Sequence, residues 1–233
     1  ATASWTLGYD ANGNRASVTL NGTPSVYTTA ATSNRLEGTT NPARSFGYDS
    51  AGNTTADGFY AAGYDLAGRL ATLSKAGITT TYSYDGLGRR VRKVASSGAG
   101  STVVFAYDTQ GHLLGEYDAN GVALREVVWL GDTPVAVFTP DAANPGNPPL
   151  VYYIHTDHLD APRVVVDSNN AVRWRWMAEP FGTTAPENDP QGLGAFTLNL
   201  RFPGQYADQE SGLFYNYFRD YDASVGRYAQ SDP

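Results

Sequence analysis

Hydrophobic and polar residues alternate along short stretches of the chain with a period of two residues. In residues 172–176, Val172, Trp174 and Trp176 alternate with Arg173 and Arg175. Comparable alternation occurs in residues 69–73 and 90–94. Alternation of this period places successive side chains on opposite faces of a β-strand. A helical period is hard to find in any part of the chain, so the pattern predicts a nearly all-β protein in which the Arg/Trp ladder serves cross-strand packing.

The composition agrees with strands and tight turns. The 233 residues include 16 Tyr and 25 Gly, and aromatic residues suit half-buried strands while Gly suits turns. Hydrophobic residues make up 41% and charged residues 17%, which argues against disorder, and no apolar run approaches the ~18–20 residues of a membrane span. A net charge of −7 without a basic patch argues against a nucleic-acid partner. The absence of cysteine excludes disulfides and thiolate metal sites.

A short motif recurs along the first half of the chain. Its six copies share the pattern Y-D-x-x-G and begin at Tyr9, Tyr48, Tyr64, Tyr84, Tyr107 and Tyr117. In each copy the Asp suits the first position of a type I turn, and the Gly suits a positive φ that closes the turn with a bulge. We therefore expect each copy to be an architectural β-hairpin. Because an isolated hairpin is marginally stable, neighbouring hairpins are expected to pair edge to edge in a continuous strip.

Two Pro-rich stretches interrupt the pattern. Residues 139–149 (TPDAANPGNPP) suit neither strand nor helix and are expected to form an exposed loop, and residues 183–194 form a second, more acidic one. We therefore expect four parts: a hairpin strip over residues 1–138, the Pro-rich loop 139–149, further strands over 150–200, and a C-terminal segment over 201–233.

The C-terminal segment is dense in both rings and charges. Its large aromatic residues are Phe202, Tyr206, Phe214, Tyr215, Tyr217, Phe218, Tyr221 and Tyr228. They lie among Arg201, Arg219, Arg227, Asp208, Asp220, Asp222 and Asp232. The charges cannot all face water while the rings are buried, so some must pair partly out of solvent, where pKa values shift most. Because shifted carboxylates are candidates for acid/base chemistry, we expect any chemistry of this chain in this segment.

The chain resembles the Rhs/YD-repeat family. The repeats match its Y-D-x-x-G-[NR] signature, residues 153–163 (YIHTDHLDAPR) look like its Y-x-H-x-D-H-L-G-x-P-R segment, and residues 201–233 look like its Rhs-associated core. The resemblance covers essentially the whole chain. It implies YD strips that curl into a partial shell or spiral as part of a hollow β-shell around the toxic C-terminal region of the same polyprotein. The core segment would be the plug.

The resemblance also implies chemistry. In many members the core segment is an intramolecular aspartyl protease that frees the toxin after a D-P-x-G-x motif. Carried over by position, Asp208 and Asp232 are implied as the catalytic carboxylates and Arg201 as their supporting cation. Two other arginines, Arg219 and Arg227, occupy equally shared positions, so the choice of cation stays open.

An aspartyl dyad needs two carboxylates so close that they cannot both ionise, and only the fold can bring Asp208 and Asp232 together. The alternative is that both are turn and ion-pair residues. Two departures from the family bear on this site. Asp222 is followed by Ala223 where the family usually has Pro, and the chain stops at Asp232-Pro233, before the bond expected to be cut. Any protease site is therefore incomplete in this chain.

No metal or cofactor is expected. His155, Asp157 and His158 are too closely spaced in a strand or turn to converge on a metal, and the only further histidine is His112. The candidate ligands for a calcium site are Asp10, Asp141, Asp160 and Asp189 with loop carbonyls. However, the chain contains no D-x-[DN]-x-D-G loop.

Two functional hypotheses follow. The first is the C-terminal part of a polymorphic toxin shell, secreted or delivered by a bacterial machine such as type VI secretion. Its partners would be the N-terminal shell and C-terminal toxin of the same polyprotein and the secretion machinery, with self-association through exposed strand edges. The second is a non-catalytic, cell-surface module that binds carbohydrate through exposed rings, for example on the Trp174/Trp176 strand.

A size estimate limits the first hypothesis. Each hairpin adds ~10 Å of sheet width, so eight or nine hairpins give a strip of ~80–90 Å. A toxin of ~130 residues has a girth of ~110 Å. This chain alone is therefore not expected to enclose a toxin.

Overall fold

The computed structural model describes residues 3–98 and 101–231, in which every regular element is a β-strand. Two compact units are present. Among the described residues, the first unit comprises residues 3–77 with 230–231, and the second unit comprises residues 78–98 and 101–229. The expected all-β fold of successive antiparallel hairpins is confirmed.

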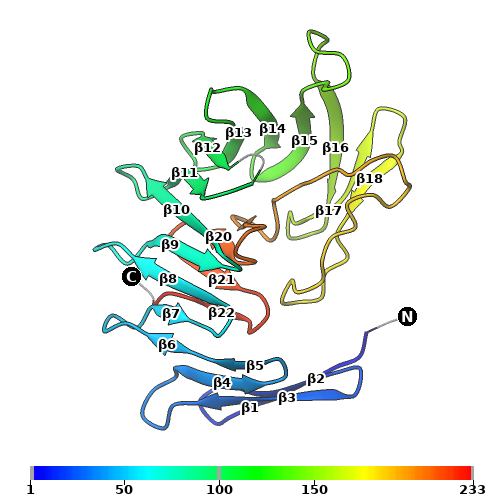
Figure 1. The fold of residues 1–233 in the computed structure, drawn as a ribbon. Coiled ribbons are helices and arrows are strands. Elements are labelled where there is room, and N and C mark those ends of the chain that lie inside the picture. The colour runs from blue at the N-terminus through cyan, green and yellow to red at the C-terminus, as the bar shows by residue number, and fades with distance from the viewer. Residues whose placement is uncertain (1–2, 99–100, 232–233) are drawn as a thin grey trace. The chain divides into compact units, whose positions relative to one another are not determined.

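In the first unit, the strands pair in sequence order (Figure 1). One antiparallel sheet contains β1 (Trp5–Tyr9), β2 (Arg15–Leu20), β3 (Thr23–Thr29), β4 (Leu36–Thr40) and β5 (Ala43–Ser45). A second antiparallel group contains β6 (Gly47–Tyr48), β7 (Thr54–Ala56), β8 (Tyr60–Tyr64) and β9 (Leu70–Lys75). Within each of these two groups, every strand pairs with its neighbours in sequence, as a strip of hairpins requires.

The second unit continues the same rule. Its antiparallel neighbours are β10 (Ile78–Tyr84), β11 (Arg90–Ala95), β12 (Thr102–Tyr107), β13 (Leu113–Tyr117), β14 (Ala123–Leu130), β15 (Thr133–Thr139), β16 (Leu150–Thr156), β17 (Pro162–Asp167) and β18 (Val172–Arg175). A separate small sheet is formed by β19 (Tyr206–Ala207), β20 (Phe214–Asn216), β21 (Arg219–Asp222) and β22 (Arg227–Tyr228). The Pro-rich residues 140–149 lie between β15 and β16, outside any strand.

The Y-D-x-x-G motif forms the same turn in all six copies. The Asp Oδ1 accepts a hydrogen bond from the amide four residues later, at 2.8–3.0 Å. The Gly has a φ of 75–94°, a region that L-residues rarely adopt. The register of each hairpin shifts at the Tyr, as a bulge requires. The turn geometry predicted from the motif is therefore present.

Two further turns use this geometry without glycine. The Oδ1 atoms of Asp157 and Asp167 accept the amides of the residues two and four positions later. The position of the motif's Gly is taken by Asp160 with a φ of 60° and by Asn170 with a φ of 62°. Asp and Asn tolerate this conformation because their short polar side chains bond locally. The strip therefore contains diverged repeats that the strict pattern misses.

The segment after β18 packs on the strands of the second unit. The orange stretch in Figure 1 returns from β18 toward β20. Its buried residues Phe196, Leu198 and Leu200 join one hydrophobic cluster with strand residues such as Val137 and Val165. Burial of this apolar surface is the main force that holds the segment on the strip.

Candidate functional site

Asp208 lies in the interior of the second unit. It follows β19 directly and is 1% exposed. Its amide donates to the Leu213 carbonyl at 2.9 Å, and its own carbonyl accepts from the Gly212 amide at 2.8 Å. The tight loop between β19 and β20 therefore fixes the backbone of Asp208 and directs its side chain inward.

The carboxylate of Asp208 pairs with two cations from β11. Arg90 Nη1 lies 2.5 Å from Oδ2 and Nη2 lies 3.0 Å from Oδ1, a bidentate arrangement. Lys93 Nζ donates to Oδ1 at 3.0 Å and to Glu210 Oε2 at 3.0 Å. Two cations and two carboxylates thus form a neutral cluster of Arg90, Lys93, Asp208 and Glu210, which we call the ion cluster.

Aromatic rings enclose the Arg90 guanidinium. Its central carbon lies 4.2 Å from the ring centroid of Tyr215, 5.1 Å from that of Phe105 and 5.4 Å from that of Tyr206. Ring faces attract a cation and exclude water from it. The Tyr215 hydroxyl also accepts from the Arg90 backbone amide at 2.8 Å. The C-terminal segment therefore contacts β11 through both rings and charges.

The ion cluster keeps Asp208 ionised. Burial alone would raise the pKa of Asp208, but the charges of Arg90 and Lys93 outweigh it and lower the pKa below its ordinary value of 3.8. Burial alone would also lower the pKa of Arg90, and Asp208 outweighs it and raises that pKa. Near neutral pH Asp208 is therefore ionised and has no proton to donate, so in a pair of carboxylates the proton would belong to the other group.

Arg201 lies elsewhere in the same unit. Its Nη1 donates to the carbonyls of Leu198 and Leu200, at 2.7 and 2.8 Å. Burial lowers the pKa of Arg201 to about 10. Arg201 and Asp208 both line a cavity of about 230 Å³, yet the guanidinium does not pair with the carboxylate. The cation that contacts Asp208 is Arg90, joined by Lys93.

The other predicted site residues occupy different positions. Arg219 on β21 lies 3.8 Å from the Tyr228 ring centroid, and Arg227 on β22 is opposite Asp222 in the strand register. Asp232 lies outside the described residues, so the proposed pair of carboxylates stays a prediction.

Sequence reasoning missed Arg90 and Lys93, although the repeat contains a signal. The sixth and ninth residues after the motif Tyr point inward in the first five copies. The sixth residues are Arg15, Thr54, Leu70, Arg90 and Leu113, and the ninth are Val18, Asp57, Leu73, Lys93 and Glu116, all of them buried. Charged residues at such positions predict buried ion pairs.

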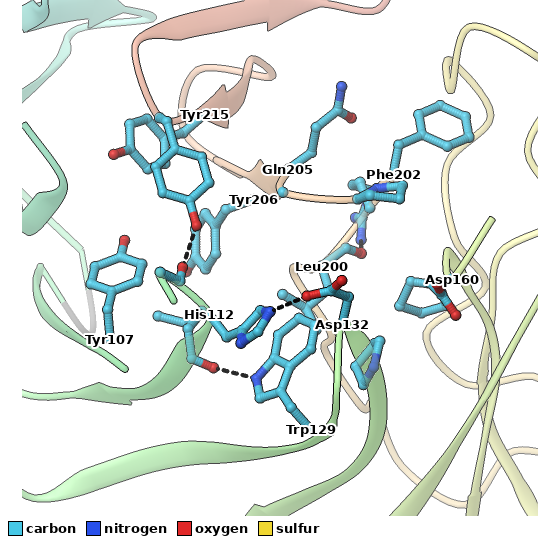
Figure 2. A pocket seen from close by; sticks show the side chains of 18 of the residues that line it. Tyr107, His112, Trp129, Asp132, Asp160, Leu200, Phe202, Gln205, Tyr206 and Tyr215 are labelled. Carbon is cyan, nitrogen blue, oxygen red and sulfur yellow. Dashed lines mark hydrogen bonds and ion pairs between the residues drawn. The ribbon is translucent and has the colours of Figure 1, made fainter. Parts of the chain in front are cut away.

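The second unit also contains a larger pocket of about 440 Å³ between the strand ends and residues 200–206. Figure 2 shows His112 beside Trp129, with the imidazole directed at Asp132. The His112 and Trp129 rings stack with centroids 4.8 Å apart. His112 Nδ1 lies 2.8 Å from Asp108 Oδ2, and Nε2 lies 2.9 Å from Asp132 Oδ1. Burial alone would lower the pKa of His112, but hydrogen bonds to the two carboxylates outweigh it and raise the pKa above 6.5.

The residues considered for sugar or metal binding have structural partners. Trp174 and Trp176 are both 0% exposed and belong to the core. Asp157 pairs with Arg163 at 2.8 Å. Within residues 3–98 and 101–231, no group of three or more His, Asp or Glu residues suitable for a metal ion occurs, and no helix could span a membrane.

The whole chain matches one known family. Residues 1–233 match the Teneurin YD-shell family from end to end. The chain belongs to this family. The sequence-based assignment to the Rhs/YD-repeat proteins is thereby confirmed.

Relatives of this YD-shell chain include bacterial toxins. Double-stranded DNA deaminase toxin A of Burkholderia cenocepacia is 30% identical over 213 residues, which cover 73% of this chain and 15% of the toxin. Toxin protein Tse5 of Pseudomonas aeruginosa is 42% identical over 83 residues, which cover 36% of this chain and 6% of Tse5. The chain thus spans a small fraction of the length of these relatives.

Solved structures share the YD-shell fold. The crystal structure of TcdB2-TccC3-TEV aligns with a TM-score of 0.75 and 17% identity over 99% of this chain and 12% of that one. The Photorhabdus luminescens Tc holotoxin pore, with the mutation TccC3-D651A, aligns with a TM-score of 0.72 and 18% identity, with the same coverage. The chain is therefore a shell-type domain related in fold to Tc toxin proteins.

Proposed function

We propose that this chain is part of a YD-repeat shell that encloses a toxin carried downstream in the same polyprotein. Residues 201–233 would free the toxin by intramolecular aspartyl proteolysis after the D-P-x-G-x motif. The observation that supports this most is Asp208, a completely buried and ion-paired carboxylate in a segment packed on the strip. Polar groups buried to this degree are costly, and perturbed carboxylates cluster at functional sites.

In the proposed reaction two carboxylates share one proton. The ionised Asp208 takes a proton from water, and the resulting hydroxide adds to the scissile carbonyl. The peptide C–N bond then breaks, and the leaving amine takes a proton from the second carboxyl group, assigned to Asp232. Arg90 and Lys93 keep Asp208 ionised and fix its orientation, while Arg201 remains the supporting cation expected from the family.

The partners follow from the same proposal. The N-terminal shell and the C-terminal toxin of one polyprotein would contact this chain, and a bacterial secretion system would deliver the assembly. Similarity to a deaminase toxin and to Tse5 supports this assignment, because both relatives are far longer than the region they share with this chain.

The carbohydrate-binding alternative depended on solvent-exposed rings on the Trp174/Trp176 strand, and these two rings are buried. Sugar-binding sites present ring faces to solvent, whereas Trp174 and Trp176 are enclosed in the core. Their nearest neighbours include Phe202 and Arg201, so no ring face on this strand is available to a sugar.

The proteolysis is tested with the protein extended through its native downstream sequence beyond Pro233. Intact mass spectrometry should give two fragments for the wild type and one uncleaved chain for Asp208→Asn and Asp232→Asn. Asp118→Asn, in an exposed turn, is the matched control and should be cleaved. Equal cleavage of wild type and all three variants ends the proposal. Near-UV circular dichroism separates a folded, inactive variant from an unfolded one.

Enclosure is tested separately by limited proteolysis of the full polyprotein. Trypsin should leave the toxin region intact while the shell is folded and digest it once urea unfolds the shell. Digestion of the toxin at the same rate in both conditions contradicts enclosure, whatever the result of the cleavage assay.

A further inference from the structure

His112 connects two neighbouring turns of the second unit. Its Nδ1 lies 2.8 Å from Oδ2 of Asp108, in its own turn, and its Nε2 lies 2.9 Å from Oδ1 of Asp132, in the turn between β14 and β15. We call these three residues the turn link. A neutral imidazole carries one N–H group and can donate to only one carboxylate, so its other nitrogen would face a carboxylate oxygen with a lone pair. The geometry of the turn link therefore requires an imidazolium that donates from both nitrogens.

Other copies of the repeat make similar connections with side chains that do not titrate near neutral pH. In four copies the residue after the motif's Gly donates to Oδ2 of the motif's Asp, and these residues are Asn14, Asn53, Arg69 and Arg89. Two of them also reach the next turn: Asn14 Nδ2 donates to Asn34 Oδ1 at 3.1 Å, and Arg89 Nη1 donates to the Asp108 carbonyl at 3.0 Å. His112 occupies the same position, so at this point of the strip the connection between turns depends on a proton.

The contact to Asp132 is the weaker end of the turn link. Asp108 Oδ1 also accepts two amides of its own turn, so Asp108 stays in place without the imidazole. The Asp132 side chain is 91% exposed, and its carboxylate accepts no other hydrogen bond within residues 3–98 and 101–231. On the far side of the same turn, the Thr133 hydroxyl donates to Asp160 at 2.7 Å, a bond that does not need His112. Loss of the proton would therefore free this turn on the side that faces His112.

The turn link borders the cavity of about 440 Å³. His112 and Asp132 both line the cavity, as does Trp129, whose ring stacks on the imidazole (Figure 2). The turn that contains His112 is also held by the C-terminal segment, because the Tyr217 hydroxyl donates to the Gly111 carbonyl. The other charged residues that line the cavity are Asp160 and Arg201. A movement of the turn that carries Asp132 would therefore change the border of this cavity.

We propose that the turn link is a pH-sensitive switch, which holds the turn between β14 and β15 against the cavity while His112 is protonated. The neutral ring keeps its bond to Asp108 and repels Asp132, and the turn then moves toward solvent. Burial alone would lower the pKa of His112, but the hydrogen bonds to the two carboxylates raise it above 6.5. The switch therefore opens as the pH rises through this higher pKa. It depends on neither enclosure of a toxin nor proteolysis, so it can fail while the proposed function stands, and the reverse also holds.

The test is nitrogen-15 NMR of the wild-type chain between pH 5 and pH 9. The ring signals of His112, the amide of Asp132 and the Nε1–H of Trp129, which donates to the Leu113 carbonyl, should shift with one common midpoint. Hydrogen exchange of residues 130–133 reports whether the turn itself is released. Corrected for its intrinsic dependence on pH, exchange should become about two- to fivefold faster above the midpoint, the range expected for an exposed ion pair.

Two substitutions fix the switch in its two states. His112→Arg should keep exchange slow at every pH, because Arg69 and Arg89 make the corresponding bonds in their own turns. His112→Val should keep exchange fast at every pH, because it removes the donors and Val122 occupies this position in the sixth copy. His155→Asn changes an exposed histidine on β16 and should titrate like the wild type. Exchange of the wild type that is equal on both sides of the His112 midpoint overturns the proposal even if no variant folds, and so does an increase in exchange shared by His112→Arg.

Discussion

Arg90 Nη1 lies 2.5 Å from Asp208 Oδ2, although the two residues are 118 positions apart in the sequence. The pair joins a hairpin of the strip to the loop after β19, and both side chains are 1% exposed. The geometry explains why a strip residue and a C-terminal residue both carry charge at positions that face the interior. Removal of either partner leaves a buried charge with too few compensating groups.

Arg90→Met is expected to destabilise the protein by about 3–5 kcal/mol, because Asp208 then keeps only Lys93 as a cation. Urea unfolding monitored by circular dichroism measures the change. The neighbouring residue provides the control. Arg89 pairs with Asp85 near the surface, so Arg89→Met should cost at most about 1 kcal/mol. Equal costs for the two variants contradict a special role for the buried pair.

Asp208→Asn is expected to destabilise the protein near neutral pH and to destabilise it less in acid. The pKa of Asp208 is lower in the folded protein than the ordinary 3.8. The ionised carboxylate therefore contributes stability that is fully present above pH 3.8 and is lost as the pH falls through the lower, folded pKa. Urea midpoints between pH 3 and pH 7 should show a wide gap between wild type and Asp208→Asn that narrows below about pH 3.8.

The matched control for this experiment is Asp118→Asn. Asp118 is a half-buried turn residue whose Oδ1 accepts hydrogen bonds from two amides, and an Asn oxygen accepts the same bonds. The pKa of Asp118 is lowered by the hydrogen bonds from the amides of Val122 and Asn120, so the urea midpoint of Asp118→Asn should approach that of the wild type in acid as well, but the change with pH should be much smaller than for Asp208→Asn. If the difference in urea midpoint between the wild type and Asp208→Asn stays constant down to pH 3, the ion pair does not lower the pKa of Asp208.

The hairpins could be predicted because their determinants are local. In each Y-D-x-x-G copy, an Asp and a Gly three residues apart fix the turn through hydrogen bonds within five residues. The turns at Asp157 and Asp167 were missed because Asp160 and Asn170 occupy the glycine position. A pattern that allows Asp or Asn at that position would have found them.

The candidate site could be predicted only in part, because its contacts are not local. The family resemblance singled out Asp208 and Arg201, and both line one cavity. Nothing in the C-terminal segment indicates that Asp208 pairs with Arg90 and Lys93, which lie in a distant hairpin. The inward positions of the repeat do indicate that these two cations are buried. The sequence therefore predicts that they need carboxylate partners, but it does not predict which carboxylates these are.

His112 should make stability depend on pH near neutrality. Its pKa in the folded protein is above the ordinary 6.5, so its charge contributes stability that is fully present below pH 6.5 and is lost as the pH rises through the folded pKa. His112→Asn keeps the bond to Asp108, since Asn14 and Asn53 make that bond in their own turns. It removes the titrating group.

Thermal unfolding of both proteins between pH 5 and pH 9 tests this prediction. The wild type should be more stable than His112→Asn at pH 5.5, and the difference should shrink as the pH rises. Proton NMR of the His112 ring gives the folded pKa directly. A difference between the two proteins that does not change with pH would mean that the contacts to Asp108 and Asp132 do not depend on the charge of His112.

Arg44→Met is expected to destabilise the first unit in the same way that Arg90→Met destabilises the second. Arg44 forms a buried ion pair with Asp57, whose Oδ1 also accepts the amides of Phe59 and Tyr60 at 2.7 Å. After the change Asp57 keeps its amide partners but loses its cation, at a cost of about 3–5 kcal/mol.

Hydrogen exchange should therefore accelerate more within residues 3–77 than within residues 101–229, because the pair lies inside the first unit. Arg69→Met, which removes a partly exposed pair with Asp65 in the same unit, should leave exchange nearly unchanged. If Arg44→Met accelerated hydrogen exchange equally in both units, the two units would unfold together.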